Sequence, residues 1–208
     1  MVEMLQRSPV TIAALRLALG SLLLATLSIG STPAAANAES DRHKRERSET
    51  VARGEYLVGL LGCGRCHTEG YLTGTEATGP LLAGSTIGIA WSGFEGAAER
   101  PGLVFARNLT PDPETGLGGW READIVRAMR TGVSKDGHQH LPVMPSANYA
   151  MLDLDDLRAI AAYLKSLPPV VRAIPGRTEP GTEPLHPYVR FGVYRFDPDG
   201  SVSERPLP

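Results

Sequence analysis

The pentapeptide Cys63-Gly64-Arg65-Cys66-His67 decides how this chain folds. It contains the only 2 cysteines among the 208 residues, and a histidine directly follows the second one. Three residues make a little less than one α-helical turn, so a helix places both thiols on one side with the imidazole beside them. A disulfide across so short a loop would add little stability. The motif therefore predicts that the three side chains bind one group together.

The C-x-x-C-H spacing is the attachment motif of c-type haem. Two thiols on one side of a helix can form thioethers with both vinyl groups of one porphyrin, and His67 then offers a ring nitrogen to the iron. A thioredoxin-like dithiol requires a βαβ context, which the sequence does not indicate. A zinc site requires about four ligands, and the chain has no second cysteine pair. We therefore predict one haem c, covalently bound through Cys63 and Cys66.

The composition fits a small domain built around a large cofactor. Hydrophobic residues make up 42% of the chain and charged residues 21%, which favours a folded protein. With 23 glycines and 17 prolines, much of the chain must be loop, and aromatic residues contribute only 6%. A porphyrin would supply the missing core. The formal charge of -2 argues against a nucleic-acid binder, whose surface would be strongly basic.

Residues 1–38 have the order of a secretory signal peptide. A basic start with Arg7 and Arg16 precedes the apolar run 17–30, and Ala36-Asn37-Ala38 has the small residues of a cleavage site. We expect export to the periplasm with cleavage after Ala38. The alternative is an uncleaved membrane anchor, but a span of about 20 apolar residues would place Arg16 inside the bilayer.

The rest of the chain divides into three parts. Residues 39–49 form a charged run, which we expect to be a solvated tail. The domain itself is expected over residues 50–170, with helices from near Ser48 or Thr50 to about Gly62, over 121–130 and over 154–166. The Gly- and Pro-rich stretch 68–119 predicts long loops. A Pro-rich extension, 171–208, contains an alternating segment at 188–196 that predicts a strand or hairpin.

A loop with two prolines contains the best candidate for a second iron ligand. Met144 lies in Pro142-Val143-Met144-Pro145, where the prolines restrict the backbone around the thioether. Burial of Met144 in the core without ligation is the alternative. His138 and His140 are rival ligands, whereas Met129 is expected in the core and Met151 has no rigid frame. Weaker candidates for contacts to the haem propionates are Trp91, Arg107, Asn108 and Trp120.

Several segments, in the right order, resemble a class I cytochrome c domain, in particular the cytochrome subunits or partners of bacterial periplasmic dehydrogenases. The resemblance covers residues of about 50–170. It is carried by Arg53-Gly54-Glu55-Tyr56-Leu57, the C-x-x-C-H motif, Asn108-Leu109-Thr110-Pro111-Asp112 through Trp120, Leu141-Pro142-Val143-Met144-Pro145, and Ala162-Tyr163-Leu164.

The resemblance implies an all-α fold: a small cytochrome c-like helical domain wrapped around one covalent haem, with long loops and an extended C-terminal tail. It implies that the first and last helices cross near Gly54 and Tyr163, and that Met144 is the axial methionine. It also implies that the carbonyl of Pro80 accepts the proton of the proximal histidine. Members of this subset often carry three haem domains, whereas this chain has a single motif.

The function expected from these features is electron transfer without catalysis. A periplasmic monohaem cytochrome would carry single electrons between a dehydrogenase and the respiratory chain, with a terminal oxidase or another cytochrome as acceptor. Membrane association is expected only through a partner or an uncleaved N-terminus. Two alternatives stay open: a five-coordinate haem protein with peroxidase or gas-binding activity, and a non-catalytic subunit of a dehydrogenase complex.

Overall fold

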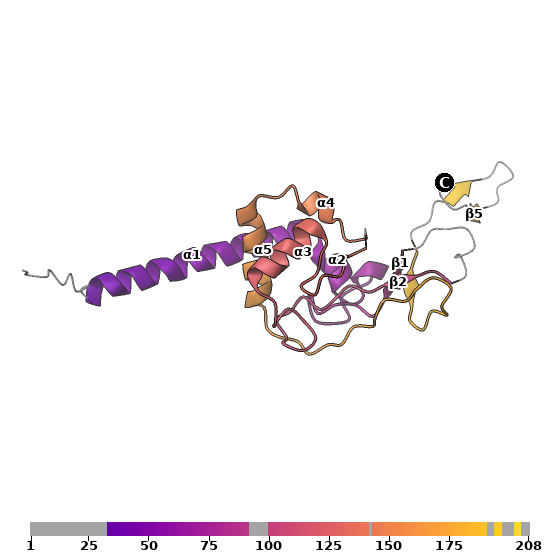
Figure 1. Ribbon diagram of the computed structural model, residues 1–208, viewed down its shortest axis with the longest axis horizontal. Coiled ribbons are helices and arrows are strands. Elements are labelled where there is room, and N and C mark those ends of the chain that lie inside the picture. The colour runs from indigo at the N-terminus through magenta and orange to yellow at the C-terminus, as the bar shows by residue number, and fades with distance from the viewer. Residues whose placement is uncertain (1–32, 92–99, 142, 191–193, 197–201, 205–208) are drawn as a thin grey trace, which may run out of the picture. The chain divides into compact units, whose positions relative to one another are not determined.

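The computed structural model describes residues 33–91, 100–141, 143–190, 194–196 and 202–204 (Figure 1). The chain divides into two compact units, residues 1–41 and 42–208. Most of the expected signal peptide, residues 1–32, lies outside the described residues. Within the described ranges, no helix combines the length and apolar character that crossing a membrane requires.

Helix α1 extends from Pro33 to Leu60 and begins well before the expected start near Ser48 or Thr50. Side chains from Asn37 to Thr50 are all exposed, so residues 39–49 are solvated but helical. Arginine, lysine and glutamate are good helix formers, and pairs such as His43 and Glu46, 3.5 Å apart, support such a helix. The charged run has no apolar stripe to mark a helix, which is why its sequence indicates a tail.

Three helices form the core of the domain. Helix α3 spans Glu122–Thr131 and helix α5 spans Leu154–Ser166, close to the expected ranges, and the two pack together. The C-terminal part of α1 crosses α5 at Gly54, where a Cβ atom would overlap the carbonyl oxygen of Ala159 and lie 2.7 Å from Cβ of Tyr163. The crossing of first and last helices at Gly54 and Tyr163 is therefore confirmed.

The remaining helices are short. Helix α2 spans Cys63–His67, a 3-10 turn covers Tyr71–Thr73, and helix α4 spans Ser146–Tyr149. The buried core joins α1, α3 and α5 to loop residues; its members are Leu57, Val58, Leu82, Leu117, Ile125, Met129, Leu157, Ile160, Ala161, Tyr163 and Leu164. The mainly helical architecture is as expected.

Two small sheets accompany the helices, which the all-α expectation did not include. Strand β1 (Gly88–Ala90) pairs antiparallel with β2 (Leu103–Val104) and parallel with β3 (Tyr188–Val189). Strands β4 (Tyr194–Phe196) and β5 (Val202–Glu204) pair with each other. The alternating segment 188–196 therefore supplies two strands to different sheets.

The chain does not leave the domain after α5. Residues 170–178, here called the strap, run from the end of α5 back toward β1 and β2 (Figure 1). Asn108, which is buried, donates from Nδ2 to the carbonyl of Val170 at 2.8 Å, and Leu103 and Thr178 exchange two backbone hydrogen bonds of 2.9 Å. The first part of the expected extension is thus tied to the domain's own loops.

Candidate functional site

Helix α2 presents the C-x-x-C-H motif at the end of a sharp turn. Gly62, between α1 and α2, has φ 68°, a left-handed conformation that glycine adopts without strain and other residues rarely do. The turn starts α2 at Cys63, so both thiols and the imidazole of His67 come from a single helical turn. Both cysteines are free and half-buried.

The two thiols are in an apolar environment. Cys63 packs against the hydrophobic core, and burial raises the pKa of both the Cys63 and the Cys66 thiol. Thiols with raised pKa values stay protonated at neutral pH, which is the opposite of a reactive redox dithiol. Among the described residues, no group of three or more histidine, cysteine or acidic side chains is arranged to hold a metal ion. The raised pKa values of the thiols therefore favour haem attachment over a redox dithiol.

His67 is held by its Nδ1 atom. This atom lies 2.7 Å from the carbonyl oxygen of Arg107. Because a carbonyl can only accept, Nδ1 carries the proton, and the lone pair of Nε2 is free to bind a metal. Burial lowers the pKa of His67, although the Arg107 carbonyl acts in the opposite direction. The imidazole is therefore neutral at neutral pH, the form that ligates iron.

The acceptor of the His67 proton differs from the expected one. The carbonyl of Pro80 accepts the N–H of Ala83 at 3.2 Å, and Arg107 takes the role expected of Pro80. Arg107 lies 40 residues from His67 in the sequence. Since every residue has a backbone carbonyl, no side-chain pattern identifies this one.

Met144, the predicted second ligand, packs against the hydrophobic core. Its side chain is half-buried against the core. Its backbone is fixed by hydrogen bonds from its N–H to Leu141, at 3.2 Å, and from Ser146 to its carbonyl, at 2.8 Å. Met129 is buried in the core and Met151 is 86% exposed, so neither competes for this role. Pro142 lies outside the described residues.

His140 is a stronger rival than His138. His138 is exposed, whereas burial lowers the pKa of His140, and a charge on His140 also lowers the pKa of His67. The two imidazoles are therefore close enough to interact electrostatically. The Nδ1 atom of His140 is buried and has no hydrogen-bond partner among the described residues. A polar group of a bound cofactor would give it one.

Tyr149 of α4 is a further member of this site. Burial is the main cause that raises its pKa to about 12, and the neighbouring Cys63 and Cys66 add to the shift. The phenol is therefore protonated and lies close to the cysteine pair. Tyr149 lies on a helix of only four residues, which is too short to show a periodic pattern, so the sequence does not identify it.

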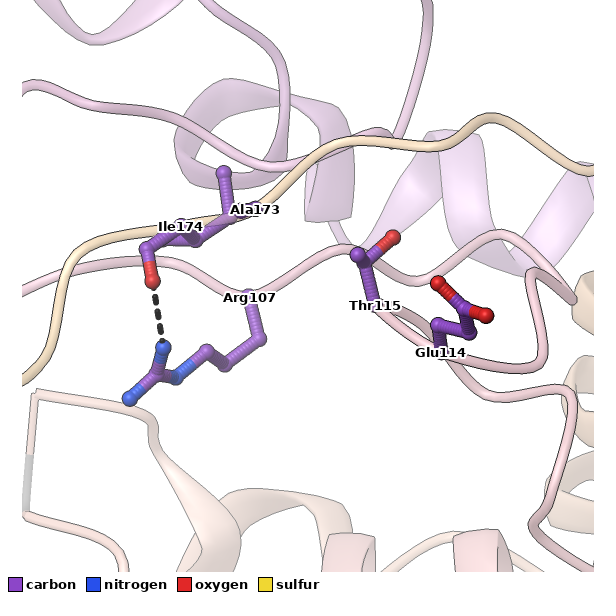
Figure 2. Close-up of a pocket in the computed structure, with 5 residues that line it drawn as sticks. All are labelled: Arg107, Glu114, Thr115, Ala173 and Ile174. Atoms are coloured by element: carbon purple, nitrogen blue, oxygen red, sulfur yellow. Dashed lines mark hydrogen bonds between the residues drawn. The ribbon is translucent and has the colours of Figure 1, made fainter.

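The residues expected at the propionates have other contacts. Asn108 and Arg107 direct their side chains to the strap, at Val170 and Ile174. Trp120 packs against the core, and Trp91 lies beneath the guanidinium of Arg177, 5.9 Å from the ring centre. A cavity of about 240 Å³ lies between the strap and the loop 107–115, lined by Arg107, Glu114, Thr115, Ala173 and Ile174 (Figure 2).

The residues of the main site fit a covalent haem. They comprise two half-buried thiols on one turn, an imidazole with Nε2 free, a thioether on a fixed loop, a buried imidazole nitrogen without a partner in the described part of the chain, and an apolar lining. This donor set suits iron in a porphyrin rather than a hydrated ion, because thioether and imidazole are neutral ligands.

Comparison with known proteins gives the same family throughout. The family model for cytochrome c matches residues 51–168, more than half of the chain. The cytochrome c subunit of the quinone alcohol dehydrogenase of Gluconobacter oxydans is 35% identical over 122 residues, covering 58% of this chain and 22% of that protein. The gluconate 2-dehydrogenase cytochrome c subunit of Pantoea cypripedii is 32% identical over 124 residues, covering 59% of this chain and 24% of that protein.

A third relative is matched over a larger share of its own length. The diheme cytochrome c-type protein of Cereibacter sphaeroides is 32% identical over 123 residues, covering 59% of this chain and 38% of that protein. The chain thus spans well under half the length of each of these relatives.

Proposed function

Because this chain belongs to the cytochrome c family, we propose that it is a monohaem electron carrier of the periplasm that exchanges single electrons between a dehydrogenase and the respiratory chain. The observation that carries the proposal is the geometry of α2. Two thiols and one imidazole share a helical turn, and the hydrogen bond from Nδ1 of His67 to Arg107 leaves Nε2 free for iron.

Each side chain has a defined role in this proposal. Cys63 and Cys66 would hold the porphyrin as thioethers, and His67 and Met144 would ligate its iron. A haem bound there supplies the Fe(III)/Fe(II) couple. A neutral thioether favours the ferrous state and so raises the reduction potential. The apolar lining would exclude water, and two protein ligands would leave the iron no position for a substrate.

The partner is inferred from the relatives. Several of them are named as cytochrome subunits of dehydrogenases, including the quinone alcohol dehydrogenase and gluconate 2-dehydrogenase. We therefore expect this chain to accept electrons from a periplasmic dehydrogenase, either as a free carrier or as part of its complex. A terminal oxidase or another cytochrome would then take the electrons.

Docking to such a partner cannot rely on a ring of lysines. The chain has few lysines, and Nζ of Lys165 donates to the carbonyls of Leu117, Gly118 and Trp120, each at 3.0 Å. An apolar contact is available instead beside the haem motif. Leu81 is 53% exposed, and its Cδ1 atom lies 3.6 Å from the Cβ position of Gly64. Small, weak interfaces of this kind are typical of redox encounters.

One observation favours a second function. His140, whose Nδ1 has no partner among the described residues, interacts electrostatically with His67 and is a possible neighbour of the iron if Met144 does not bind it. A five-coordinate haem with a neighbouring imidazole is suited to peroxide or to a diatomic gas.

Carbon monoxide distinguishes the two functions. The protein should be exported in a host that attaches c-type haem, denatured for a haem stain, and titrated for haem per chain. We expect one covalent haem, lost in the Cys63→Ala/Cys66→Ala double variant, and no carbon monoxide binding by the reduced protein at neutral pH. Rapid carbon monoxide binding would show an open iron and contradict the carrier proposal.

Export and processing are a separate part of the proposal. The sequence before Ala38 supports cleavage, which would shorten α1 from its N-terminal end. The mass of the protein purified from the periplasm should match a chain that begins at Glu39. A mass corresponding to a chain that retains Met1 would contradict cleavage and favour an N-terminal anchor.

A further inference from the structure

The side chain and the backbone of Arg107 contact two different parts of the molecule. Its carbonyl oxygen lies 2.7 Å from Nδ1 of His67. Its guanidinium nitrogen Nη1 donates to the carbonyls of Ile174 and Pro175 in the strap, at 3.0 and 3.1 Å. Figure 2 shows the Arg107 side chain reaching toward Ile174 across the cavity. One residue thus joins the strap to the expected iron ligand.

A second contact connects the strap to the same histidine. The N–H of Gly84 donates to the carbonyl of His67 at 2.8 Å. The side chain of Ile174 packs on Gly84 so closely that a Cβ atom there would lie 2.7 Å from its Cδ1 atom and 2.9 Å from the carbonyl of Ala106. The strap therefore contacts both residues whose backbone groups hydrogen-bond His67.

The strap is itself fixed on either side of Ile174. Before it, Arg172 pairs with the part-buried Glu69 at 2.5 Å, and the Arg172 N–H donates to Thr115 at 3.0 Å. After it, Thr178 exchanges hydrogen bonds with Leu103. The carbonyls of Ile174 and Pro175, which accept hydrogen bonds from Arg107, are therefore fixed in position and can restrict the Arg107 side chain.

We propose that Arg107 is a positioning residue and that the strap, through Arg107, sets the strength of the hydrogen bond at Nδ1 of His67. The proposal rests on the proposed function, since it takes His67 as the iron ligand. A strong hydrogen bond from Nδ1 makes the imidazole more basic, which stabilises Fe(III) and lowers the reduction potential. Loosening the strap weakens that bond and raises the potential.

The energy of the side-chain contact is not what matters here. Arg107 is exposed, and hydrogen bonds at an exposed site contribute little to stability. Their effect is positional, because the guanidinium and the carbonyl belong to the same residue. Releasing the guanidinium therefore allows the residue whose carbonyl accepts the proton of His67 to move.

Two sets of variants test the proposal on the haem-loaded protein. A chain ending at Ala173 loses both strap carbonyls but retains the charge of Arg107, and a chain ending at Thr178 retains the strap as its control. Arg107→Ala removes the donor, whereas Arg107→Lys keeps a positive charge and N–H donors that can reach the strap. The readouts are the reduction potential and the exchange rate of the His67 Nδ1 proton, measured by NMR.

The chain ending at Ala173 should have a higher reduction potential and several-fold faster exchange of the Nδ1 proton, and the chain ending at Thr178 should match the full chain. Exchange should be faster in Arg107→Ala and restored by Arg107→Lys. The point variants are compared by exchange alone, because losing a positive charge changes the potential by itself. If the chain ending at Ala173 does not fold, the exchange rates of the two point variants alone test the proposal.

Unchanged exchange in Arg107→Ala, with haem covalently bound, would overturn the proposal and leave the electron-carrier function intact. Absence of covalent haem from the full chain would overturn both. A lower melting temperature with unchanged exchange and potential would reduce Arg107 to a structural residue, which also contradicts the proposal.

Discussion

Gly54 of α1 lies directly against the backbone carbonyl of Ala159 in α5, and no larger residue fits between the two helices. A Cβ atom at Gly54 would overlap that oxygen and lie 2.6 Å from the carbonyl carbon, inside van der Waals contact. Arg53 and Asp156 pair beside this crossing at 2.9 and 3.1 Å. The crossing fixes the end of α1 and with it the start of α2, which presents the C-x-x-C-H motif.

Gly54→Ala should therefore destabilise the domain. Alanine is favoured over glycine in a helix by about 1 kcal/mol, but overpacking against a backbone atom costs about 1–3 kcal/mol, and here the helices must separate. We expect a net loss of up to about 2 kcal/mol in the free energy of unfolding, measured by denaturant titration. The matched control is Gly59→Ala in the same helix, where no atom lies within 4 Å of the Cβ position. That variant should be as stable as the wild type or slightly more stable, and equal stabilisation by both changes would contradict the packing.

Asp124 should make the folded domain less stable as the pH falls. Its carboxylate accepts from the N–H, Nε and Nη2 of Arg121, at 3.1, 3.0 and 3.0 Å, and these bonds lower its pKa to about 2. The unfolded value is about 4. Because the folded pKa is the lower one, the contribution is complete above a pH of about 4 and is lost as the pH falls toward about 2.

Asp124→Asn should thus be less stable than the wild type at a pH of about 6, with a difference that shrinks between about pH 4 and about pH 2. Asp155→Asn is the control, since that carboxylate is 91% exposed and contacts only Arg158 among the described residues. Thermal unfolding across this pH range checks both. A difference between wild type and Asp124→Asn that stays constant throughout the acid range would show that this carboxylate is not specially stabilised.

Lys165 should stabilise the glycine-rich loop before α3. Its ammonium group donates to the carbonyls of Leu117, Gly118 and Trp120. Hydrogen bonds from a charged group contribute about 1.5–3 kcal/mol, so Lys165→Met, which keeps the aliphatic stem, should lose about 2 kcal/mol of stability. Lys135→Met is the control, because Nζ of that exposed lysine reaches only Gly119 among the described residues, at 3.5 Å. Similar small effects of both changes would refute the role of Lys165.

Local patterns predict the parts of the fold that have local causes. The apolar spacing of 154–166, and the acidic start and Gly132 stop around α3, indicate both helices nearly to the residue. Apolar periodicity does not predict the early start of α1, because solvated charged residues form a helix there without an apolar face. Local patterns also do not predict the small sheets or the path of the strap. These depend on contacts between residues far apart in the sequence, such as Leu103 and Thr178.

The candidate site also has a part that local spacing predicts and a part that depends on tertiary contacts. Cys63, Cys66 and His67 are brought together by one helical turn, so their spacing alone predicts the arrangement. The Nδ1 acceptor is a backbone atom 40 residues away, and the loop that places Arg107 there is fixed by tertiary contacts. The buried Nδ1 of His140 and the position of Tyr149 beside the cysteines likewise become visible only in the folded chain.

The central claim is that His67 and Met144 hold the iron of one covalent haem. The most direct test is the visible and near-infrared spectrum of the oxidised protein, matured with its haem, as wild type, Met144→Ala and His140→Ala. We predict the sulfur-to-iron charge-transfer band in the wild type and in His140→Ala, and its loss in Met144→Ala. A wild-type spectrum without the band, or a band that persists in Met144→Ala, would contradict the claim.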